Sequence, residues 1–213
     1  MSVMPDNLAS VLRLLLVTDD GLLAGRDLVA AVRAAVAGGT TAVQLRLKRA
    51  SARELAAAGR ALLAAVEVPV FLNDRLDVAL AIGAAGVHLG TDDLPVARAR
   101  EICPPGFVIG ASVGLAAEIP NGEHADYWGI GPWRATSTKG DAGEALGASG
   151  FAALRAHAGA RPCVAIGGLR PEDVPDTLQA GAAGVAVVSG ILGAVDIEEA
   201  ARRYAAAFTP VAR

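Results

Sequence analysis

The sequence has little of several features that would assign it to a specialised class of protein. Its 213 residues include two cysteines, Cys103 and Cys163, which are far apart and lack the spacing of a zinc or redox motif. No secretory leader precedes Val11, so a cytoplasmic, reduced protein is expected. There are 19 basic and 22 acidic residues, and the basic ones are scattered. This distribution offers no surface for nucleic acid or for an anionic membrane.

Long hydrophobic runs are also missing. The mean hydropathy is +0.43, but the apolar stretches are rich in alanine and glycine, and every long helical stretch contains Arg, Asp or Glu. No run reaches the roughly 20 apolar residues that a membrane span needs. The sequence therefore predicts a soluble protein of one domain over residues 1–213, whose first ten residues form a flexible tail.

What the sequence does have is a regular alternation of short apolar runs and longer amphipathic, alanine-rich runs, which is typical of parallel strands joined by helices. Eight runs are expected to be strands: Leu12–Thr18, Ala42–Lys48, Val70–Asn73, Gly86–Leu89, Val108–Ser112, Tyr127–Gly131, Cys163–Gly167 and Gly184–Ser189. Seven are expected to be helices: Asp27–Ala37, Ser51–Val66, Asp77–Ile82, Pro95–Ile102, Ser149–His157, Pro171–Ala180 and Ile197–Phe208. The segment after Ser112 is broken by Pro120 and Gly122, and a single turn or a loop is expected there.

A short repeat supports this pattern, because residues 81–90 and 179–190 both pass from helix to strand through Gly-Ala-Ala-Gly. Eight strand-helix units in one chain predict a closed (β/α)8 TIM barrel. The alternative is an open, doubly wound sheet, for which the usual glycine-rich nucleotide motif after the first strand is missing. In a barrel, the residues that end the strands would meet at one mouth, where active sites of this fold lie.

The second predicted strand carries polar residues at alternate positions. Gln44, Arg46 and Lys48 alternate with aliphatic residues, so their side chains share one face of the strand. If the aliphatic face contacts the helices, the polar face points into the barrel, where two cations need an anionic partner. The alternative is a solvated face on an exposed edge strand, and a closed barrel has no such edge.

Two predicted strands end in carboxylates, Asp74 and Asp93. On neighbouring strands these side chains could approach one Mg²⁺ ion, which is commonly held by one or two carboxylates together with substrate phosphate oxygens. Either residue could instead be a helix N-cap, and that role is expected for Asp92. Together with the cations of the second strand, the pair favours a site for magnesium and pyrophosphate.

Two other regions have the composition of a phosphate monoester site. Thr136 and Thr138 lie in one loop, and the glycine-rich ends of the last two strands lie at residues 165–169 and 188–191. Barrels often bind phosphate between the loops that follow strands seven and eight. Lys139 could bridge the two anionic sites. The alternative is that these glycines only make tight turns.

The three histidines predict no catalytic triad. His88 lies inside an apolar strand and is expected to be a packed core residue, not a base, while His124 and His157 fall in a loop and a helix. No serine, histidine and aspartate are arranged for nucleophilic catalysis.

In chain order, these segments resemble the thiamine phosphate synthase family: QLRLK, FLND, GVHLGTDD, IGAS, GPWRATSTK and AIGGL. The resemblance runs from LLLVTDD, beginning at Leu14, to VVSGI, ending at Ile191. It implies a (β/α)8 enzyme that joins 4-amino-2-methyl-5-hydroxymethylpyrimidine diphosphate to a thiazole phosphate, releasing thiamine phosphate and pyrophosphate. It also implies a homodimer.

The resemblance also implies a role for each matching residue. Four would hold the diphosphate: Arg46, Lys48, Asn73 and Lys139. Two would bind Mg²⁺: Asp74 and Asp93. Two would contact the pyrimidine or the departing pyrophosphate: Gln44 and Ser112. Five would bind the thiazole phosphate: Thr136, Thr138, Gly168, Val188 and Ser189. The residues expected to act on the leaving group are Arg46, Lys48, Ser112 and Lys139.

The mechanism implied by the resemblance is dissociative, with loss of pyrophosphate before the thiazole nitrogen attacks. Such a site stabilises developing negative charge and needs no protein nucleophile. Ser112 is accordingly expected to donate a hydrogen bond, because no histidine is expected near it: Gly114 occupies the nearby position and His88 lies inside its own strand.

Three positions depart from the family pattern: Thr91 in place of Gln, Gly114 in place of His, and Ala135 in place of Pro. Two other functions stay open. A related branch of the superfamily isomerises a thiazole phosphate and does not need the metal and diphosphate residues. A homologue without catalytic activity could bind a thiamine precursor as a sensor.

Overall fold

The computed structural model describes residues 8–135 and 144–208, and within them eight parallel strands close into a barrel. The strands are β1 (Leu14–Val17), β2 (Ala42–Leu45), β3 (Val70–Asn73), β4 (Gly86–Leu89), β5 (Val108–Ser112), β6 (Tyr127–Ile130), β7 (Cys163–Ile166) and β8 (Gly184–Val187). Each strand pairs with the next in the chain, and β8 pairs with β1. The predicted single-domain TIM barrel is confirmed, and the open sheet is wrong.

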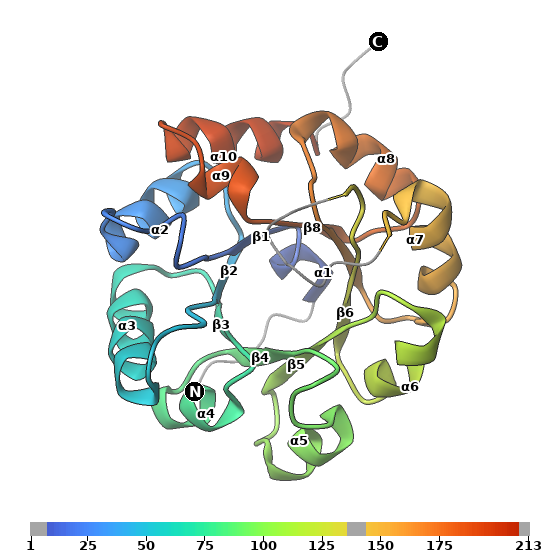
Figure 1. Ribbon diagram of the computed structural model, residues 1–213, viewed down its shortest axis with the longest axis horizontal. Coiled ribbons are helices and arrows are strands. Elements are labelled where there is room, and N and C mark those ends of the chain that lie inside the picture. Colours follow the sequence, from blue (N-terminus) through green and yellow to red (C-terminus); the bar gives the residue numbers. More distant parts are fainter. Residues whose placement is uncertain (1–7, 136–143, 209–213) are drawn as a thin grey trace.

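The helices form an outer ring around the barrel (Figure 1). They are α2 (Leu28–Ala37), α3 (Ala52–Ala65), α4 (Leu76–Ile82), α5 (Val96–Ile102), α6 (Ile119–Gly122), α7 (Gly147–Arg155), α8 (Val174–Gln179) and α10 (Ile197–Ala206). Two 3-10 turns precede helices, η1 (Ala116–Glu118) before α6 and η2 (Pro171–Asp173) before α8. The short segment after Ser112 is thus a turn and a one-turn helix, as its proline and glycine indicated. A further short helix, α9 (Ser189–Leu192), follows β8 and was not predicted.

Helix α1 (Leu8–Val11) corrects the expected N-terminal tail. Residues 8–10 were predicted to belong to a flexible segment, and they are helical. Val11 is buried and Leu8 is partly buried against the apolar cluster inside the barrel. In Figure 1 this helix lies across the centre of the barrel. The reason is burial, because α1 covers apolar side chains that an open barrel end would expose to water.

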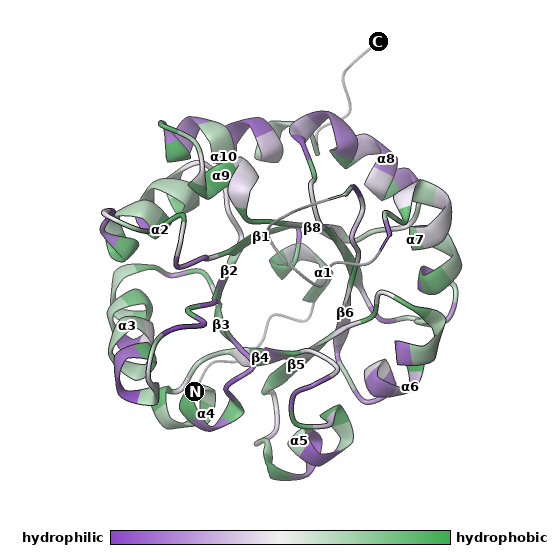
Figure 2. Ribbon diagram, viewed as in Figure 1, coloured by the Kyte–Doolittle hydropathy of each residue, from purple (hydrophilic) through white to green (hydrophobic). Residues whose placement is uncertain are grey.

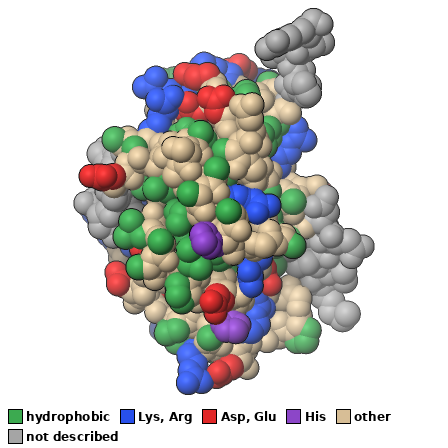
Figure 3. Space-filling view, turned by 90° about the vertical axis from the view of Figure 1, so that its right-hand side faces the viewer, with side chains coloured by type: hydrophobic (Ala, Val, Ile, Leu, Met, Phe, Trp, Pro, Cys, Tyr) green, Lys and Arg blue, Asp and Glu red, His purple; other side chains and the backbone are tan. Residues whose placement is uncertain are grey.

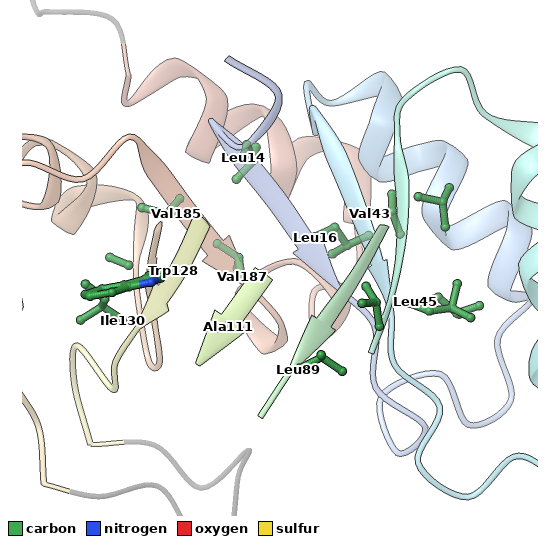
Figure 4. Close-up of a cluster of buried hydrophobic side chains, with 14 of the residues drawn as sticks. Leu14, Leu16, Val43, Leu45, Leu89, Ala111, Trp128, Ile130, Val185 and Val187 are labelled. Carbon is green, nitrogen blue, oxygen red and sulfur yellow. The ribbon is translucent and has the colours of Figure 1, made fainter. Parts of the chain in front are cut away.

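Alternation along the strands divides the core into two layers. Inward-pointing residues such as Leu15, Phe71 and Tyr127 fill the barrel, while the residues between them face the helices. Figure 4 shows this second layer, with side chains from β1, β2, β4, β5, β6 and β8. In Figure 2 the strands are mainly hydrophobic, and hydrophilic residues lie on the outer helices and loops. The aliphatic face of β2 therefore contacts helices, as predicted.

The ends of the strands differ from the prediction at the barrel mouth. The second strand was expected to reach Lys48, but its ladder ends at Leu45. Beyond that residue the Thr18 side chain replaces the strand pairing: its Oγ1 accepts a hydrogen bond from Arg46 N at 2.8 Å and donates one to Arg46 O at 3.1 Å. The extension is thus held in place without being part of the sheet.

The outer surface carries both signs of charge. In Figure 3, basic and acidic side chains are interspersed among apolar ones on the face turned to the viewer. Among the residues with assigned positions, no helix is long and apolar enough to cross a membrane.

We expect the layer between sheet and helices to carry much of the stability. Leu62 on α3 has no exposed surface, whereas Ile102 at the end of α5 is 61% exposed. Leu62→Ala should lower the free energy of unfolding by about 2–5 kcal/mol, and the control Ile102→Ala by about 0.5 kcal/mol or less. Urea unfolding followed by circular dichroism measures both, and equal losses would contradict the assignment of this layer.

Candidate active site

A cavity of about 350 Å³ opens at the carboxyl ends of the strands. Ten of the predicted site residues line it: Gln44, Arg46, Lys48, Asn73, Asp74, Asp93, Ser112, Gly168, Val188 and Ser189. Three more predicted residues, Thr136, Thr138 and Lys139, lie outside the described residues. The closed barrel thus brings together side chains from β2, β3, β4, β5, β7 and β8, as expected for the mouth of this fold.

Arg46 has the anionic partner that its position in the barrel required. Its guanidinium lies 3.1 Å from the Asp19 carboxylate, and the two side chains are 17% and 20% exposed. Asp19 comes directly after Thr18, which holds the Arg46 backbone. Asp19 was not among the predicted site residues. The run Thr-Asp-Asp after the first strand was the available signal, since it is one more strand that ends in acid.

Lys48 lies closer to the rim. Its backbone N donates to Asp20 Oδ2 at 2.7 Å, and its ammonium lies 3.8 Å from Asp74 Oδ2. The side chain is 52% exposed, so this ion pair is weak on its own. The lysine can therefore move its charge toward a ligand at little cost.

Below the cations lies a layer of buried polar side chains. Gln44 is 4% exposed and its Nε2 donates to Asn73 Oδ1 at 2.9 Å. This orients the two amides, because the Asn73 oxygen is engaged and its nitrogen is left as the donor group. Gln44 and Asn73 both line the cavity, and their contacts to a substrate stay a prediction.

Asp74 and Asp93 lie side by side at the ends of β3 and β4. The pKa of Asp74 is raised to about 6, first by burial and then by the hydrogen bond and charge of Asp93, against the lowering effect of Lys48 and Arg46. Two carboxylates in such contact repel each other when both are ionised. A divalent cation would relieve that repulsion.

Neither carboxylate caps a helix. The N-cap of α4 is Arg75 and that of α5 is Pro95, and neither end has a side-chain capping bond. Asp93 Oδ2 instead accepts from Gly90 N at 2.7 Å within its own loop, and Asp74 has a positive φ of 62°. The capping alternative is therefore wrong for Asp74 and Asp93, and also for Asp92.

The two carboxylates suit Mg²⁺, which takes its other ligands from water and substrate, better than they suit a metal ion that is bound by protein side chains alone. Among the described residues there is no group of three or more His, Cys, Asp or Glu that could hold a metal ion. Two adjacent carboxylates leave the other positions of an octahedron to water and substrate oxygens, which is how Mg²⁺ is commonly bound.

His88 corrects the sequence analysis. It was expected to be a packed core residue away from Ser112, but it lines the cavity, and its Nε2 lies 3.0 Å from Ser112 Oγ. Its Nδ1 lies 3.0 Å from the hydroxyl of Tyr127. The residue does lie inside β4, as predicted, but its side chain points into the barrel, where it meets Ser112 of the neighbouring strand β5. Strand period alone could not place two inward residues on adjacent strands at the same height.

The glycines after β7 are shaped by their neighbours. Gly167 and Gly168 have φ values of 100° and 63°, which side chains rarely adopt. A Cβ on Gly167 would lie 2.7 Å from Pro132, and one on Gly168 would lie 3.0 Å from the Cβ of Arg134. Arg134 is in turn held by a buried carboxylate, that of Asp173. These glycines therefore let the loop after β6 contact the end of β7, while their backbone faces the cavity.

The three departures from the family pattern lie in the loops after β4, β5 and β6. Gly114 is packed so closely that a Cβ there would lie 2.8 Å from Gly131 O. The Glu118 carboxylate, also on the cavity and not predicted, accepts from Gly114 N at 2.6 Å. Thr91 is exposed, and Ala135 is the last described residue before the gap at 136–143. None of them removes a residue from the charged side of the cavity.

Comparisons with known proteins agree with this geometry. A family model described as thiamine monophosphate synthase matches residues 14–191. The thiamine-phosphate synthase of Azorhizobium caulinodans is 53% identical over 196 residues, which cover 90% of this chain and 92% of that protein. That of Xanthobacter autotrophicus is 51% identical over 201 residues, covering 92% and 95%.

A solved structure, thiamine phosphate pyrophosphorylase from Pyrococcus furiosus, superposes with a TM-score of 0.84 at 35% identity and covers 94% of this chain and 97% of that one. The match of the family model, the close relatives and the superposition together confirm the resemblance seen in the motifs. The chain belongs to the thiamine monophosphate synthase family.

Proposed function

We propose that this cavity joins 4-amino-2-methyl-5-hydroxymethylpyrimidine diphosphate to a thiazole phosphate, with release of pyrophosphate. The observation that carries the proposal is the arrangement of charge at one mouth, where Arg46 and Lys48 lie beside the carboxylates of Asp74 and Asp93. Cations and a carboxylate pair together suit a metal-bound diphosphate, because each charged group of the ligand then has a partner of opposite sign. Membership of the family supports the same reaction.

In this proposal Asp74 and Asp93 would hold Mg²⁺, and the ion would supply positive charge to the oxygens of the leaving diphosphate. Arg46 and Lys48 bind the same oxygens from the β2 side, and Asn73 contributes its free amide nitrogen. Gln44 orients Asn73 and faces the pyrimidine. These groups stabilise negative charge as it develops on the leaving group, which is usually the largest contribution to catalysis of this kind.

The chemistry proposed is dissociative. The bond between the pyrimidine methylene carbon and the diphosphate oxygen breaks, pyrophosphate leaves with the electron pair, and the carbon becomes a stabilised cation. The thiazole nitrogen then donates its electron pair to that carbon. Ser112 lies on the cavity and donates a hydrogen bond to the departing oxygens, and no covalent bond to the protein is formed.

The thiazole phosphate is assigned to the opposite side of the mouth, at Gly168, Val188 and Ser189. Supporting this, the open turn after β7 and the start of α9 place backbone and a hydroxyl on the same cavity. Thr136, Thr138 and Lys139 stay predictions of the sequence for this phosphate and for the diphosphate, as do a homodimer and a cytoplasmic location.

The isomerase alternative is disfavoured by the metal and diphosphate residues on the cavity, which an isomerase would not need. The packing is tight at Gly114, where the family pattern has His. An imidazole at this position would require its Cβ to lie 2.8 Å from a carbonyl oxygen, a distance that real Cβ atoms do not adopt without movement of the backbone. The departure at Gly114 therefore follows from the close approach of the loops after β5 and β6, and it does not distinguish the two functions. On the diphosphate side, Arg46, Lys48, Asn73, Asp74 and Asp93 all line the cavity, and Lys139 lies outside the described residues.

Pyrophosphate release is the test of both the reaction and the metal site. With both substrates and Mg²⁺, the wild-type protein should release pyrophosphate. Asp93→Ala should lower the rate by about a hundredfold or more, because a metal ligand is lost, while its melting temperature stays unchanged. The matched control is the adjacent, exposed Asp92→Ala, which should turn over normally. No release by the wild type would indicate an isomerase or a sensor, and normal turnover of Asp93→Ala at limiting Mg²⁺ would place the metal elsewhere.

The two anionic ligands should depend on different residues. Arg46→Ala and Lys48→Ala should each weaken binding of the pyrimidine diphosphate by roughly tenfold to a hundredfold, the effect of losing a charged hydrogen bond, and leave thiazole phosphate binding nearly unchanged. Separate calorimetric titrations measure both, with the neighbouring exposed Arg49→Ala as control. An equal loss for the two ligands would show that β2 does not face a dedicated diphosphate site.

The proximity of His88 to Ser112 makes it necessary to test for a nucleophilic serine. If the reaction is dissociative, protein quenched during turnover with labelled pyrimidine diphosphate should have an unmodified intact mass. Ser112→Ala is the matched control and should also stay unmodified, with a rate lower by about a hundredfold to a thousandfold. A pyrimidine adduct on Ser112 that forms and decays at the catalytic rate would contradict the proposal.

A further inference from the structure

The hydroxyl of Tyr127 lies in the apolar interior of the barrel and has one hydrogen-bond partner among the described residues. The residue is fully buried, in a cluster with Leu15, Phe71 and Val164. Among the described residues, the hydrogen-bond partner of its hydroxyl is His88 Nδ1, at 3.0 Å. Burial raises the pKa of Tyr127 further above its ordinary value, so the phenol keeps its proton. A buried O–H donor without an acceptor is costly, and Nδ1 is the acceptor within reach.

Glycines on two strands make room for this pair of rings. In the strand register, His88 lies opposite Gly110, which lies opposite Tyr127, and Ser112 lies opposite Gly129. A Cβ on Gly110 would lie 2.2 Å from Tyr127 Cζ, and a Cβ on Gly129 would lie 3.0 Å from His88 Cε1. The rings thus occupy the space that two side chains would otherwise fill. The result is a chain of hydrogen bonds from Tyr127 on β6 through His88 on β4 to Ser112 on β5, which leads from the barrel interior to the cavity.

This chain of hydrogen bonds determines which nitrogen of His88 carries the hydrogen. If Tyr127 donates to Nδ1, the hydrogen of a neutral imidazole is on Nε2. Nε2 then donates to Ser112 Oγ, 3.0 Å away, and the hydrogen of the serine hydroxyl is left to point into the cavity. The opposite tautomer would make Nε2 the acceptor of the serine proton, as in an activated nucleophile. The direction of the hydrogen bond from Tyr127 therefore decides whether Ser112 donates its hydrogen into the cavity or gives it to His88.

We propose that Tyr127 is a positioning residue that acts through His88 to hold the Ser112 hydroxyl as a hydrogen-bond donor toward the departing pyrophosphate. The inference rests on the proposed function for its final contact, and on the described geometry for the rest. Ser112 and His88 are among the described residues that line the cavity, and Tyr127 is not. Its effect on the reaction has to pass through the other two side chains.

A double-mutant cycle separates this role from a general effect on the barrel. Tyr127→Phe removes one oxygen atom and should lower kcat by about tenfold, as expected for one neutral hydrogen bond, with little change in KM for either substrate. In a Ser112→Ala background the same substitution should change kcat by about twofold or less, because the group through which it acts is gone. Pyrophosphate release measures each rate, and thermal unfolding confirms that each variant is folded.

The control is Phe71→Leu, a packing change beside the same ring, whose centroid lies 6.1 Å from that of Tyr127. Its effect should be equal in the wild-type and Ser112→Ala backgrounds. A wild-type protein that turns over, combined with an additive Tyr127→Phe and Ser112→Ala pair, would overturn the positioning role alone. A wild-type protein that releases no pyrophosphate would overturn the proposed function and the final contact together.

The tautomer of His88 gives a readout that does not depend on turnover. The chain has three histidines, so nitrogen NMR of histidine-labelled protein gives a simple spectrum, and loss of one ring signal in His88→Gln assigns it. The wild type should show the hydrogen on Nε2, and Tyr127→Phe should shift the ring toward the other tautomer. A wild type with the hydrogen on Nδ1, or an unchanged ring in Tyr127→Phe, would contradict the proposal.

Discussion

The closed ring of backbone hydrogen bonds is the constraint on which the rest of the structure depends. The first strand pairs with the second at Leu15 and Ala42, and with the last at Leu14 and Val185. With no free edge, every strand directs its carboxyl end to the same mouth and alternate side chains to the same interior. Polar residues that would be solvated on an open sheet are therefore turned toward one another. The cavity is a direct consequence of that closure.

At the mouth each of the two described cations has a carboxylate partner, whereas the carboxylates of Asp74 and Asp93 lie against each other. Arg46 is held by Asp19 and lies largely out of solvent, whereas Lys48 is half exposed and only loosely paired with Asp74. Asp74 has in addition the neighbouring carboxylate of Asp93, and its pKa is raised to about 6 as a result of burial and of that contact. Among the residues that the structure describes, the carboxylate pair is therefore the part of the site with uncompensated negative charge, and it is the part best suited to a divalent cation. A fixed arginine and a mobile lysine beside it suit the anion that such a cation would carry.

Missing side chains are as important to the site as the polar groups. Gly110 and Gly129 leave space for the rings of Tyr127 and His88 within the barrel, and Gly114 allows the backbone after β5 to pass close to that after β6. Side chains at these places would displace the rings or the loops, not merely reduce the cavity. Close packing of aromatic groups against glycine also restricts their movement, which keeps the distances from Tyr127 to His88 and from His88 to Ser112 short.

The sequence by itself determined the barrel, the positions of most helices and strands, and ten of the residues on the cavity, because each depends on patterns within a short stretch. Alternation put Gln44, Arg46 and Lys48 on one face, and strand endings identified Asp74 and Asp93. The tertiary structure alone decided that Asp19 pairs with Arg46, 27 residues away, and that His88 contacts Ser112, 24 residues away. Those partners depend on how far neighbouring strands are staggered when the barrel closes, and the period of a single strand carries no information about stagger.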